Sequence, residues 1–182
     1  MKLIVGVTGA SGAVLAKRLL EVLKKKKIET HLIITKDAEL ILKEELKGVD
    51  LSKLATHTHS PIDFYATISS GSFKVDGMVV VPCSMKTVGA IANCVAHNLL
   101  VRAADVCLKQ NRKVVLVPRE TPMSLIHLRN MVTVKEAGAV VLPPVLAFYP
   151  KPKNLDEMVD FIVGKILDSL DIENKLYRRW KG

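Results

Sequence analysis

Small residues and hydroxyl groups follow two apolar runs of the sequence, in two short stretches of similar composition. Gly9–Gly12 comes directly after the first apolar run, and Ser84–Thr87 comes after a later one. Small residues let the backbone approach a ligand closely, and the N–H groups at a helix N-terminus attract anions. Two such stretches are typical of a site for a phosphate-bearing ligand. Taken singly, each is also compatible with a tight turn or a helix N-cap that binds nothing.

A charged pair lies between two prolines further along the chain. Arg119 and Glu120 stand between Pro118 and Pro122, which hold the turn. The Arg119 guanidinium suits bidentate binding of a phosphate. Glu120 is a candidate acid–base group if burial raises the pKa of its carboxyl group. The alternative is an ion pair on the surface of a rigid turn.

A second proline-rich loop offers aromatic groups. Residues 143–150 carry Phe148 and Tyr149, which would supply an apolar wall and one hydroxyl group. Lys165 falls on the predicted last helix and could approach from the same side. By itself, a lysine at this position is more often solvated than functional.

The histidines predict no metal site. His57 and His59 are two residues apart in a flexible segment, and the others are scattered along the chain at His31, His97 and His127. No carboxylate or cysteine cluster completes a ligand set of the usual spacing. A Gly-x-Ser-x-Gly elbow for a catalytic serine is also missing. We therefore expect chemistry without a metal.

These candidate residues must be positioned by elements that the apolar pattern indicates. Strands are predicted over residues 3–7, 30–34, 77–81, 113–117 and 140–142. Helices are predicted over residues 13–23, 36–46, from about 84, 98–110, 124–137 and 154–170. Residues 48–72 are predicted to form a long functional loop with one short strand or helical turn.

Strands that alternate with helices indicate an α/β fold with a doubly wound, mainly parallel sheet, Rossmann-like or flavodoxin-like. We expect a single domain over residues 1–182, with a C-terminal tail from about residue 171. Ligands of such sheets bind at the carboxyl ends of the strands. Because the candidate motifs follow those ends, we expect one active site there.

Composition narrows the classes of partner. Of the 182 residues, 49% are hydrophobic but only 4% are aromatic, which favours an aliphatic core. The net charge of +9 fits small anionic ligands better than nucleic acid, because no aromatic residues interleave the charges. Three cysteines without a CxxC pair or a leader predict a cytoplasmic protein with buried free thiols. No apolar run reaches the length of a membrane span.

The sequence resembles the UbiX family of flavin prenyltransferases over about residues 2–170. The resemblance is carried by Val7–Gly12, Ser84–Thr87, Asn98–Asp105, Arg119–Pro122, Ile126–Met131, Pro143–Pro144 and Ala147–Tyr149. It implies a Rossmann-like FMN-binding fold, assembled as a homododecamer. It also implies metal-free transfer of a dimethylallyl group from dimethylallyl phosphate to N5 and C6 of reduced FMN. The prenylated FMN then serves a UbiD-type decarboxylase.

The resemblance also assigns roles to residues. It implies FMN contacts at Gly9, Ala10, Ser11, Thr35, Ser84, Met85, Lys86, Thr87 and Arg119. It implies contacts to the substrate phosphate, some across subunit interfaces, at Lys109, Arg119, Tyr149 and Lys165, with Arg102 near the site. Proton handling and phosphate departure are implied for Ser11, Glu45 and Glu120.

Two other functions stay open at this point. One is a flavin-dependent decarboxylase of the related FMN-binding fold, a class of enzyme that relies on a catalytic histidine after the first helix. The other is a non-catalytic FMN carrier. The choice between a monophosphate and a diphosphate substrate is open too.

Overall fold

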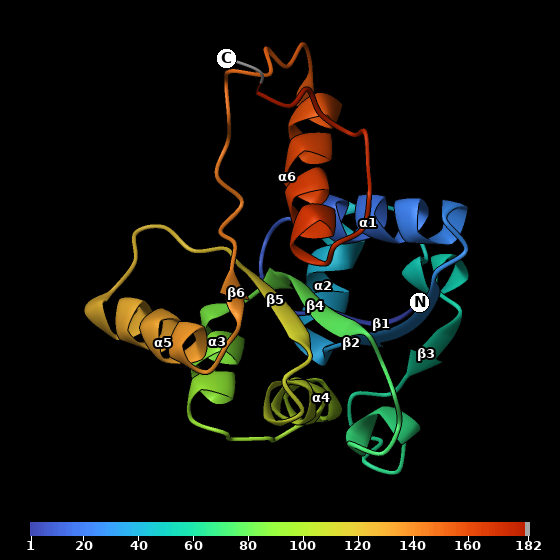
Figure 1. The fold of residues 1–182 in the computed structure, drawn as a ribbon, viewed down its shortest axis with the longest axis vertical. Helices are drawn as coiled ribbons and strands as arrows, with labels where there is room; N and C mark the ends of the chain where they lie inside the picture. Colours follow the sequence, from blue (N-terminus) through green and yellow to red (C-terminus); the bar gives the residue numbers. More distant parts are fainter. Residues whose placement is uncertain (181–182) are drawn as a thin grey trace.

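The computed structural model describes residues 1–180, which form one six-stranded sheet flanked by helices (Figure 1). The strands are β1 (Lys2–Val7), β2 (Glu29–Ile34), β3 (His57–His59), β4 (Gly77–Cys83), β5 (Lys113–Pro118) and β6 (Val140–Val141). Their order is β3-β2-β1-β4-β5-β6, and every neighbouring pair is parallel. The predicted doubly wound parallel sheet is confirmed.

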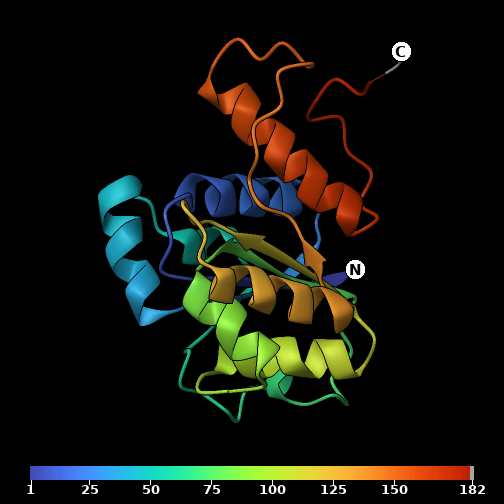
Figure 2. The ribbon, with the colours of Figure 1, turned by 90° about the vertical axis from the view of Figure 1, so that its left-hand side faces the viewer.

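Helices cover both faces of this sheet (Figures 1 and 2). One face carries α1 (Ala13–Lys25) and α6 (Leu155–Ser169), with α2 (Lys36–Glu45) beside α1. The other face carries α3 (Met85–Ala92), α4 (Leu99–Lys109) and α5 (Leu125–Glu136). Two 3-10 turns, η1 (Leu51–Leu54) and η2 (Thr67–Ser69), lie in the segment that was predicted as a long loop.

One predicted strand end is wrong. The third strand is predicted to end at Val81 because the next residue, proline, lacks an N–H donor, but β4 continues through Pro82 to Cys83. The register with β5 shifts between Val80 and Cys83, so the ladder makes no demand on the Pro82 nitrogen. Its carbonyl oxygen remains an acceptor and binds the Thr8 backbone N–H at 3.2 Å.

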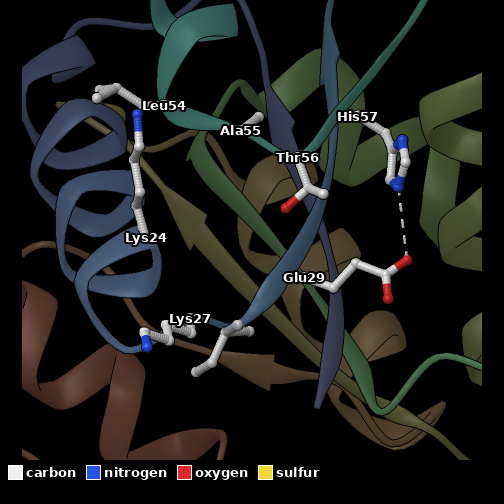
Figure 3. Close-up of a pocket in the computed structure, with 8 residues that line it drawn as sticks. Lys24, Lys27, Glu29, Leu54, Ala55, Thr56 and His57 are labelled. Carbon is white, nitrogen blue, oxygen red and sulfur yellow. Dashed lines mark ion pairs between the residues drawn. The ribbon is translucent and has the colours of Figure 1, made fainter.

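Strand β3 lies at one edge of the sheet and brings three histidines together. Parallel pairing sets His31 beside His57 and Ile33 beside His59. Glu29 lies at the start of β2, and Figure 3 shows its carboxylate facing His57. Residues two apart on a strand share one face of a sheet. The prediction that His31 is scattered, away from His57 and His59, is therefore wrong: His31 and His57 are far apart in the sequence, but the sheet makes them neighbours.

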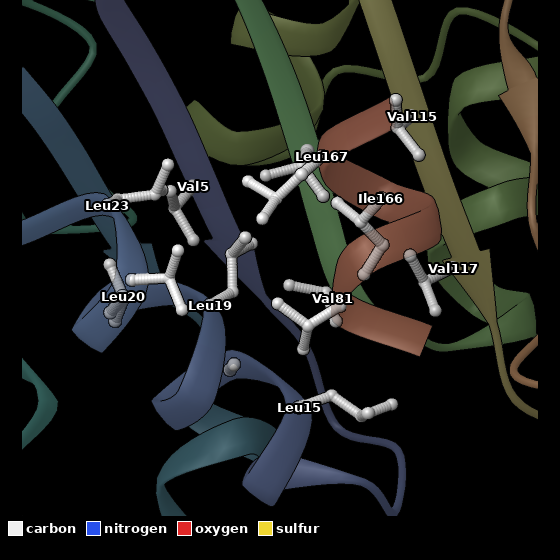
Figure 4. Close-up of a cluster of buried hydrophobic side chains, with 14 of the residues drawn as sticks. Val5, Leu15, Leu19, Leu20, Leu23, Val81, Val115, Val117, Ile166 and Leu167 are labelled. Atoms are coloured by element: carbon white, nitrogen blue, oxygen red, sulfur yellow. The ribbon is translucent and has the colours of Figure 1, made fainter. Parts of the chain in front are cut away.

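The core is aliphatic, as the composition predicts, and it divides between the two faces of the sheet. Val5, Val81 and Val115 pack against α1 and α6, with Leu19 and Leu167 among their partners (Figure 4). The alternate residues of the same strands pack against the helices of the opposite face, among them Ile4, Val80, Val114 and Leu116. Burial on both faces explains why these strands read as continuous apolar runs.

The C-terminal tail packs back onto α6. Asn174 is buried and its Nδ2 donates to the Gly164 carbonyl at 3.2 Å and to Asp168 at 2.8 Å. Tyr177 donates its hydroxyl to Asp168 at 2.5 Å. The last residues of the predicted domain and tail, 181–182, lie outside the described residues.

The cysteines differ in their surroundings. Cys83 and Cys107 are buried free thiols as predicted, and burial raises the pKa of both, for Cys107 to about 11. Cys94 is exposed, so the prediction of buried thiols is wrong there. Within residues 1–180, no helix has both the length and the apolar character required to cross a bilayer.

Candidate active site

A cleft opens at the carboxyl ends of β1, β2 and β4. The order of the strands reverses between β1 and β4, and such a switch point is where open α/β sheets bind ligands. The cleft has a volume of about 190 Å³. Its walls are Thr8, Gly9, Thr35, Lys36, Asp37, Pro61, Ile62, Ser84, Lys86, Thr87, His97 and Asn98.

A buried hydroxyl group joins the two central turns of this cleft. Thr8, only 1% exposed, donates its hydroxyl to the Pro82 carbonyl oxygen at 2.9 Å. The Thr8 hydroxyl oxygen in turn accepts the Ser84 backbone N–H at 2.7 Å. The turn after β1 and the turn after β4 are thus fixed to each other by side-chain chemistry as well as by strand pairing.

Three helices begin at the cleft, each with a polar N-cap. Thr35 accepts the Ala38 N–H of α2 at 3.4 Å, and Ser84 accepts the Thr87 N–H of α3 at 3.3 Å. Asn98 caps α4 in the same way, at 2.9 Å from the Val101 nitrogen. Their converging N-termini give the cleft a positive potential that suits a phosphate group.

Gly9 is required by a close approach. A Cβ atom on Gly9 would lie 2.6 Å from the Cβ of Asp37. Asp37 also forms an ion pair with Lys86, and the hydrogen bond from that ammonium group lowers the pKa of the Asp37 carboxyl group. The Lys86 cation is therefore held by a carboxylate of the chain itself, and an anionic ligand would compete for it.

The N-terminus of α1 is occupied by a side chain. The Glu45 carboxylate accepts the Gly12 N–H at 2.9 Å and the Ala13 N–H at 2.8 Å. Burial works to raise the pKa of Glu45, but hydrogen bonds from the Ser11 hydroxyl and these N–H groups lower it overall. The sequence analysis expected this turn to offer its N–H groups to a ligand. At Gly12 and Ala13 they bind Glu45 instead.

Arg119 and Glu120 follow β5 beside this group. The Arg119 backbone N–H donates to the Cys83 carbonyl at 3.1 Å, and the positive charge of Arg119 contributes to the lowered pKa of Glu45. The Glu120 carboxylate accepts its neighbour's N–H, that of Thr121, at 3.1 Å. Among the described residues, Arg119 and Glu120 form no ion pair with each other.

Four residues that the resemblance assigned to the substrate lie away from the cleft walls. Arg102 binds Asp105 at 2.8 Å and the Ser69 carbonyl at 3.2 Å. Lys109 ends the 11-residue helix α4, about 15 Å along the axis from the cleft. The other two are Tyr149, whose ring packs edge-on against Trp180 at 5.6 Å between centroids, and the exposed Lys165 on α6.

The nine predicted FMN contacts divide into two groups. Five line the cleft, namely Gly9, Thr35, Ser84, Lys86 and Thr87. The other four, Ala10, Ser11, Met85 and Arg119, are outside its walls, and the side chain of Met85 packs in the core below α3.

Four residues of the cleft wall were not predicted from the sequence, namely Asp37, Pro61, Ile62 and His97. Pro61 and Ile62 come from the irregular segment after β3, which is tied to the start of α4 by the Leu99 N–H bonded to the Pro61 carbonyl at 2.8 Å. Asn98 did carry a signal, because a helix N-cap in a parallel α/β protein usually lies at the carboxyl ends of the strands.

The chain matches the family model described as Flavoprotein over residues 1–167. It is 51% identical over 182 residues to the flavin prenyltransferase UbiX of Methanocaldococcus jannaschii, covering 99% of this chain and 98% of that protein. The chain belongs to the UbiX family of flavin prenyltransferases. The resemblance inferred from the sequence motifs is thereby confirmed.

Solved structures of UbiX-like proteins have the same fold. A crystal structure of AnUbiX (PadA1) in complex with FMN and dimethylallyl pyrophosphate superposes with a TM-score of 0.97 at 46% identity, covering 100% of this chain and 97% of that one. A dodecameric FMN-dependent Ubix-like decarboxylase from Escherichia coli O157:H7 superposes equally well, with 48% identity and full coverage of both chains.

The hydrogen bonds of the Thr8 hydroxyl group should stabilise both the fold and the FMN site of this UbiX-family protein. Replacing Thr8 by Val keeps the shape but leaves the Ser84 N–H without its acceptor, and the Pro82 carbonyl keeps only the Thr8 backbone N–H as a donor. We expect Thr8→Val to lower the free energy of unfolding by about 1–3 kcal/mol and to weaken FMN binding, because the Ser84 turn loses its anchor. Denaturant unfolding and quenching of FMN fluorescence measure the two effects.

Thr8→Ser is the matched control, since it retains the hydroxyl group and removes only a methyl group. It should bind FMN nearly as well as the wild type. Equal FMN affinity of the Val and Ser variants would contradict the role given to this hydroxyl.

Glu45 predicts a dependence on pH. Its pKa is lower in the folded chain than in the unfolded one, so its stabilising effect is complete above its unfolded pKa, near 4.3, and is lost as the pH falls through the native value. We expect Glu45→Gln to cost about 0.3–1 kcal/mol at pH 7, from the helix N-terminus alone. Thermal melting of both proteins between pH 7 and pH 3.5 measures the difference, which should shrink below about pH 4.

Glu44→Gln, one residue earlier on α2 and exposed, controls for the loss of a surface charge. It should melt like the wild type throughout. A Glu45→Gln deficit that grows on acidification would mean that Glu45 is not the anion that α1 requires.

Proposed function

We propose that this chain transfers a dimethylallyl group from dimethylallyl phosphate to N5 and C6 of reduced FMN and releases phosphate. The prenylated FMN would then be passed to a UbiD-type decarboxylase. The observation that carries this proposal is the cleft at the switch point, in a chain that is similar over its whole length to named flavin prenyltransferases. FMN would be the ligand of this cleft.

The cleft fits FMN on chemical grounds. Three helix N-termini and the Lys86 ammonium group suit the phosphate, and Gly9 lines the cleft without a side chain. The hydroxyl groups of Thr35, Ser84 and Thr87 add hydrogen-bonding partners. Reduced FMN would supply two nucleophilic atoms: N5 would take the carbon that the phosphate oxygen leaves, and C6 would bond to the dimethyl-substituted carbon of the former alkene.

The protons must balance in this transfer. Two protons leave the flavin as the C–N and C–C bonds form; one adds to the middle carbon of the former alkene and one leaves with the phosphate. We assign Ser11 and Glu45 to the proton that adds to the middle carbon of the former alkene. The Ser11 hydroxyl hydrogen-bonds to the Glu45 carboxylate, whose lowered pKa keeps it anionic. The Glu45 carboxylate accepts the hydrogen bond of the Ser11 hydroxyl group and so fixes the orientation of that hydroxyl group.

Arg119 and Glu120 are assigned to the departing phosphate. The guanidinium of Arg119 would bind the phosphate oxygens as the C–O bond breaks. Glu120 would then give a proton to the leaving group. No metal is needed in this scheme, because arginine and lysine side chains supply the positive charge that a divalent ion would otherwise provide.

Completion of the site by a second subunit explains the residues that lie away from the cleft. A cleft of about 190 Å³ is below the roughly 300–1,000 Å³ of typical ligand pockets. Lys109, Tyr149 and Lys165 would therefore act in the cleft of a neighbouring copy, with Arg102 near it. We propose a homododecamer, like the dodecameric relative from Escherichia coli O157:H7.

Exposed apolar side chains support this assembly. Helix α5 leaves Leu125, Ile126 and Val132 more than half exposed, and the loop before α6 does the same with Val145 and Phe148. Patches of this kind are typical of surfaces that another chain covers. The buried free thiols of the chain suit a reducing compartment, so we place the enzyme in the cytoplasm.

A decarboxylase is the second candidate, because the relative from Escherichia coli O157:H7 carries that name. It predicts carbon dioxide release from a carboxylic acid substrate without dimethylallyl phosphate. An FMN carrier predicts that FMN is returned unchanged. Both are separated from prenyl transfer by the mass of the flavin product.

The decisive assay is anaerobic incubation of the protein with reduced FMN and either dimethylallyl phosphate or the diphosphate, followed by mass spectrometry of the flavin. We expect a flavin enlarged by one dimethylallyl unit in place of a hydrogen. Glu120→Gln and Lys109→Ala should slow its formation by at least about 100-fold, the lower range for loss of an acid–base group.

Lys113→Ala is the matched control for Lys109→Ala, because Lys113 is an exposed lysine at the start of β5 whose partner is Asp171. Mixed oligomers test whether two subunits share one site. Subunits with Arg119→Ala mixed with subunits with Lys109→Ala should regain activity, because some clefts then combine an intact Arg119 with an intact Lys109 from a neighbour. Wild-type rates for Glu120→Gln and Lys109→Ala would refute these roles.

A further inference from the structure

Four side chains with metal-binding atoms meet at the edge of the sheet, away from the cleft. They are Glu29 and His31 on β2 and His57 and His59 on β3. Thr35, at the cleft, is four residues beyond His31, or about 13 Å along the strand direction. This group, here called the histidine cluster, has no part in the proposed prenyl transfer.

The distances within the histidine cluster match those between the ligands of a small divalent ion. Glu29 Oε1 is 3.1 Å from His31 Nε2 and 3.6 Å from His57 Nε2. Ligands about 2.0–2.1 Å from a tetrahedral Zn²⁺ are separated by about 3.3–3.5 Å. One ligand atom from each of Glu29, His31 and His57 lies within 4.8 Å of the others.

The fourth member orients one of these ligands. His31 Nδ1 is 2.9 Å from His59 Nε2, and a proton on His31 Nδ1 leaves the lone pair of its Nε2 toward Glu29. Metal-binding histidines almost always have such a partner on the second ring nitrogen.

The site combines one rigid side and one open side. The side chain of His31 is only 5% exposed, whereas that of His57 is 51% exposed. Beside His57 lies a shallow hollow between Lys24 and Thr56, through which an ion can enter (Figure 3).

One cation competes for the same carboxylate. Lys2 Nζ lies 3.2 Å from Glu29 Oε1, and it also lies 4.5 Å from the centre of the Phe73 ring. An entering divalent ion would displace this ammonium group from the carboxylate, and the Phe73 ring would still hold it.

We propose that Glu29, His31 and His57 bind one zinc-class divalent ion, with His59 as the positioning residue for His31. Nitrogen and carboxylate ligands suit Zn²⁺, and three protein ligands leave the fourth position to water. The ion would join the edge strand β3, only three residues long, to β2. The ion would stabilise this edge of the sheet and would be separate from the FMN cleft.

The test is titration of the full-length, chelator-treated protein with Zn²⁺ in competition with a chromophoric chelator. All proteins carry Cys94→Ser, because this exposed thiol could bind zinc by itself. We expect one ion per chain, and a rise in Tm on zinc addition, because the ion binds only the folded site. Co²⁺ in place of Zn²⁺ should give the strong visible absorption of a four-coordinate site.

Variants separate this site from chance binding. His57→Ala removes an exposed ligand without threatening the fold and should weaken zinc binding by at least about tenfold, as should Glu29→Gln. His59→Ala should weaken it by about 10–100-fold, the usual effect of losing an outer partner. His127→Gln, which changes a histidine on α5, is the matched control and should bind zinc like the parent protein.

Equal zinc affinity in the parent protein and His57→Ala would overturn the proposal, as would the absence of zinc binding in the parent. Circular dichroism confirms that each variant is folded. A tetrahedral Co²⁺ spectrum that persists in His57→Ala would place the ion elsewhere.

Discussion

The Thr8 hydroxyl is the contact on which the arrangement of the cleft depends. It binds the Pro82 carbonyl and the Ser84 N–H at once, so the turns after β1 and β4 keep one fixed spacing. Between these turns the order of strands reverses, and the helices on either side diverge. The parallel sheet creates the opening, and this buried hydrogen-bonded group sets its width. The N-termini of α2, α3 and α4 can then point at one ligand.

The charges around the cleft are balanced before any ligand arrives. Glu45 binds the N–H groups that begin α1, and Asp37 holds Lys86. A carboxylate at a helix N-terminus is stabilising, so the same group that orders Ser11 also supports the fold. A phosphate that enters must replace Asp37 as the partner of Lys86. Binding is thus an exchange of anions, which favours ligands with more than one contact.

Much of the fold could be predicted from the sequence, because strands buried on both faces leave long apolar runs and helices leave clear N-caps. The turns at Gly9 and Ser84 also follow their strands directly, so their meeting at one edge follows from the parallel sheet. Contacts between distant segments could not be predicted. Nothing local in the sequence shows that Glu45 reaches the start of α1 or that His57 pairs with His31. Those depend on how α2 packs and on a three-residue strand too short to leave a pattern.

The central claim is that FMN binds in the cleft at the switch point, and a crystal structure of the protein with FMN tests it most directly. The account predicts flavin density between the turns at Gly9 and Ser84, with Thr35 or Ser84 within hydrogen-bonding distance of the ligand. Tyr149 or Lys165 of a neighbouring copy should close the same cleft. Flavin density elsewhere, such as in the hollow beside Lys24 and His57, would contradict the account.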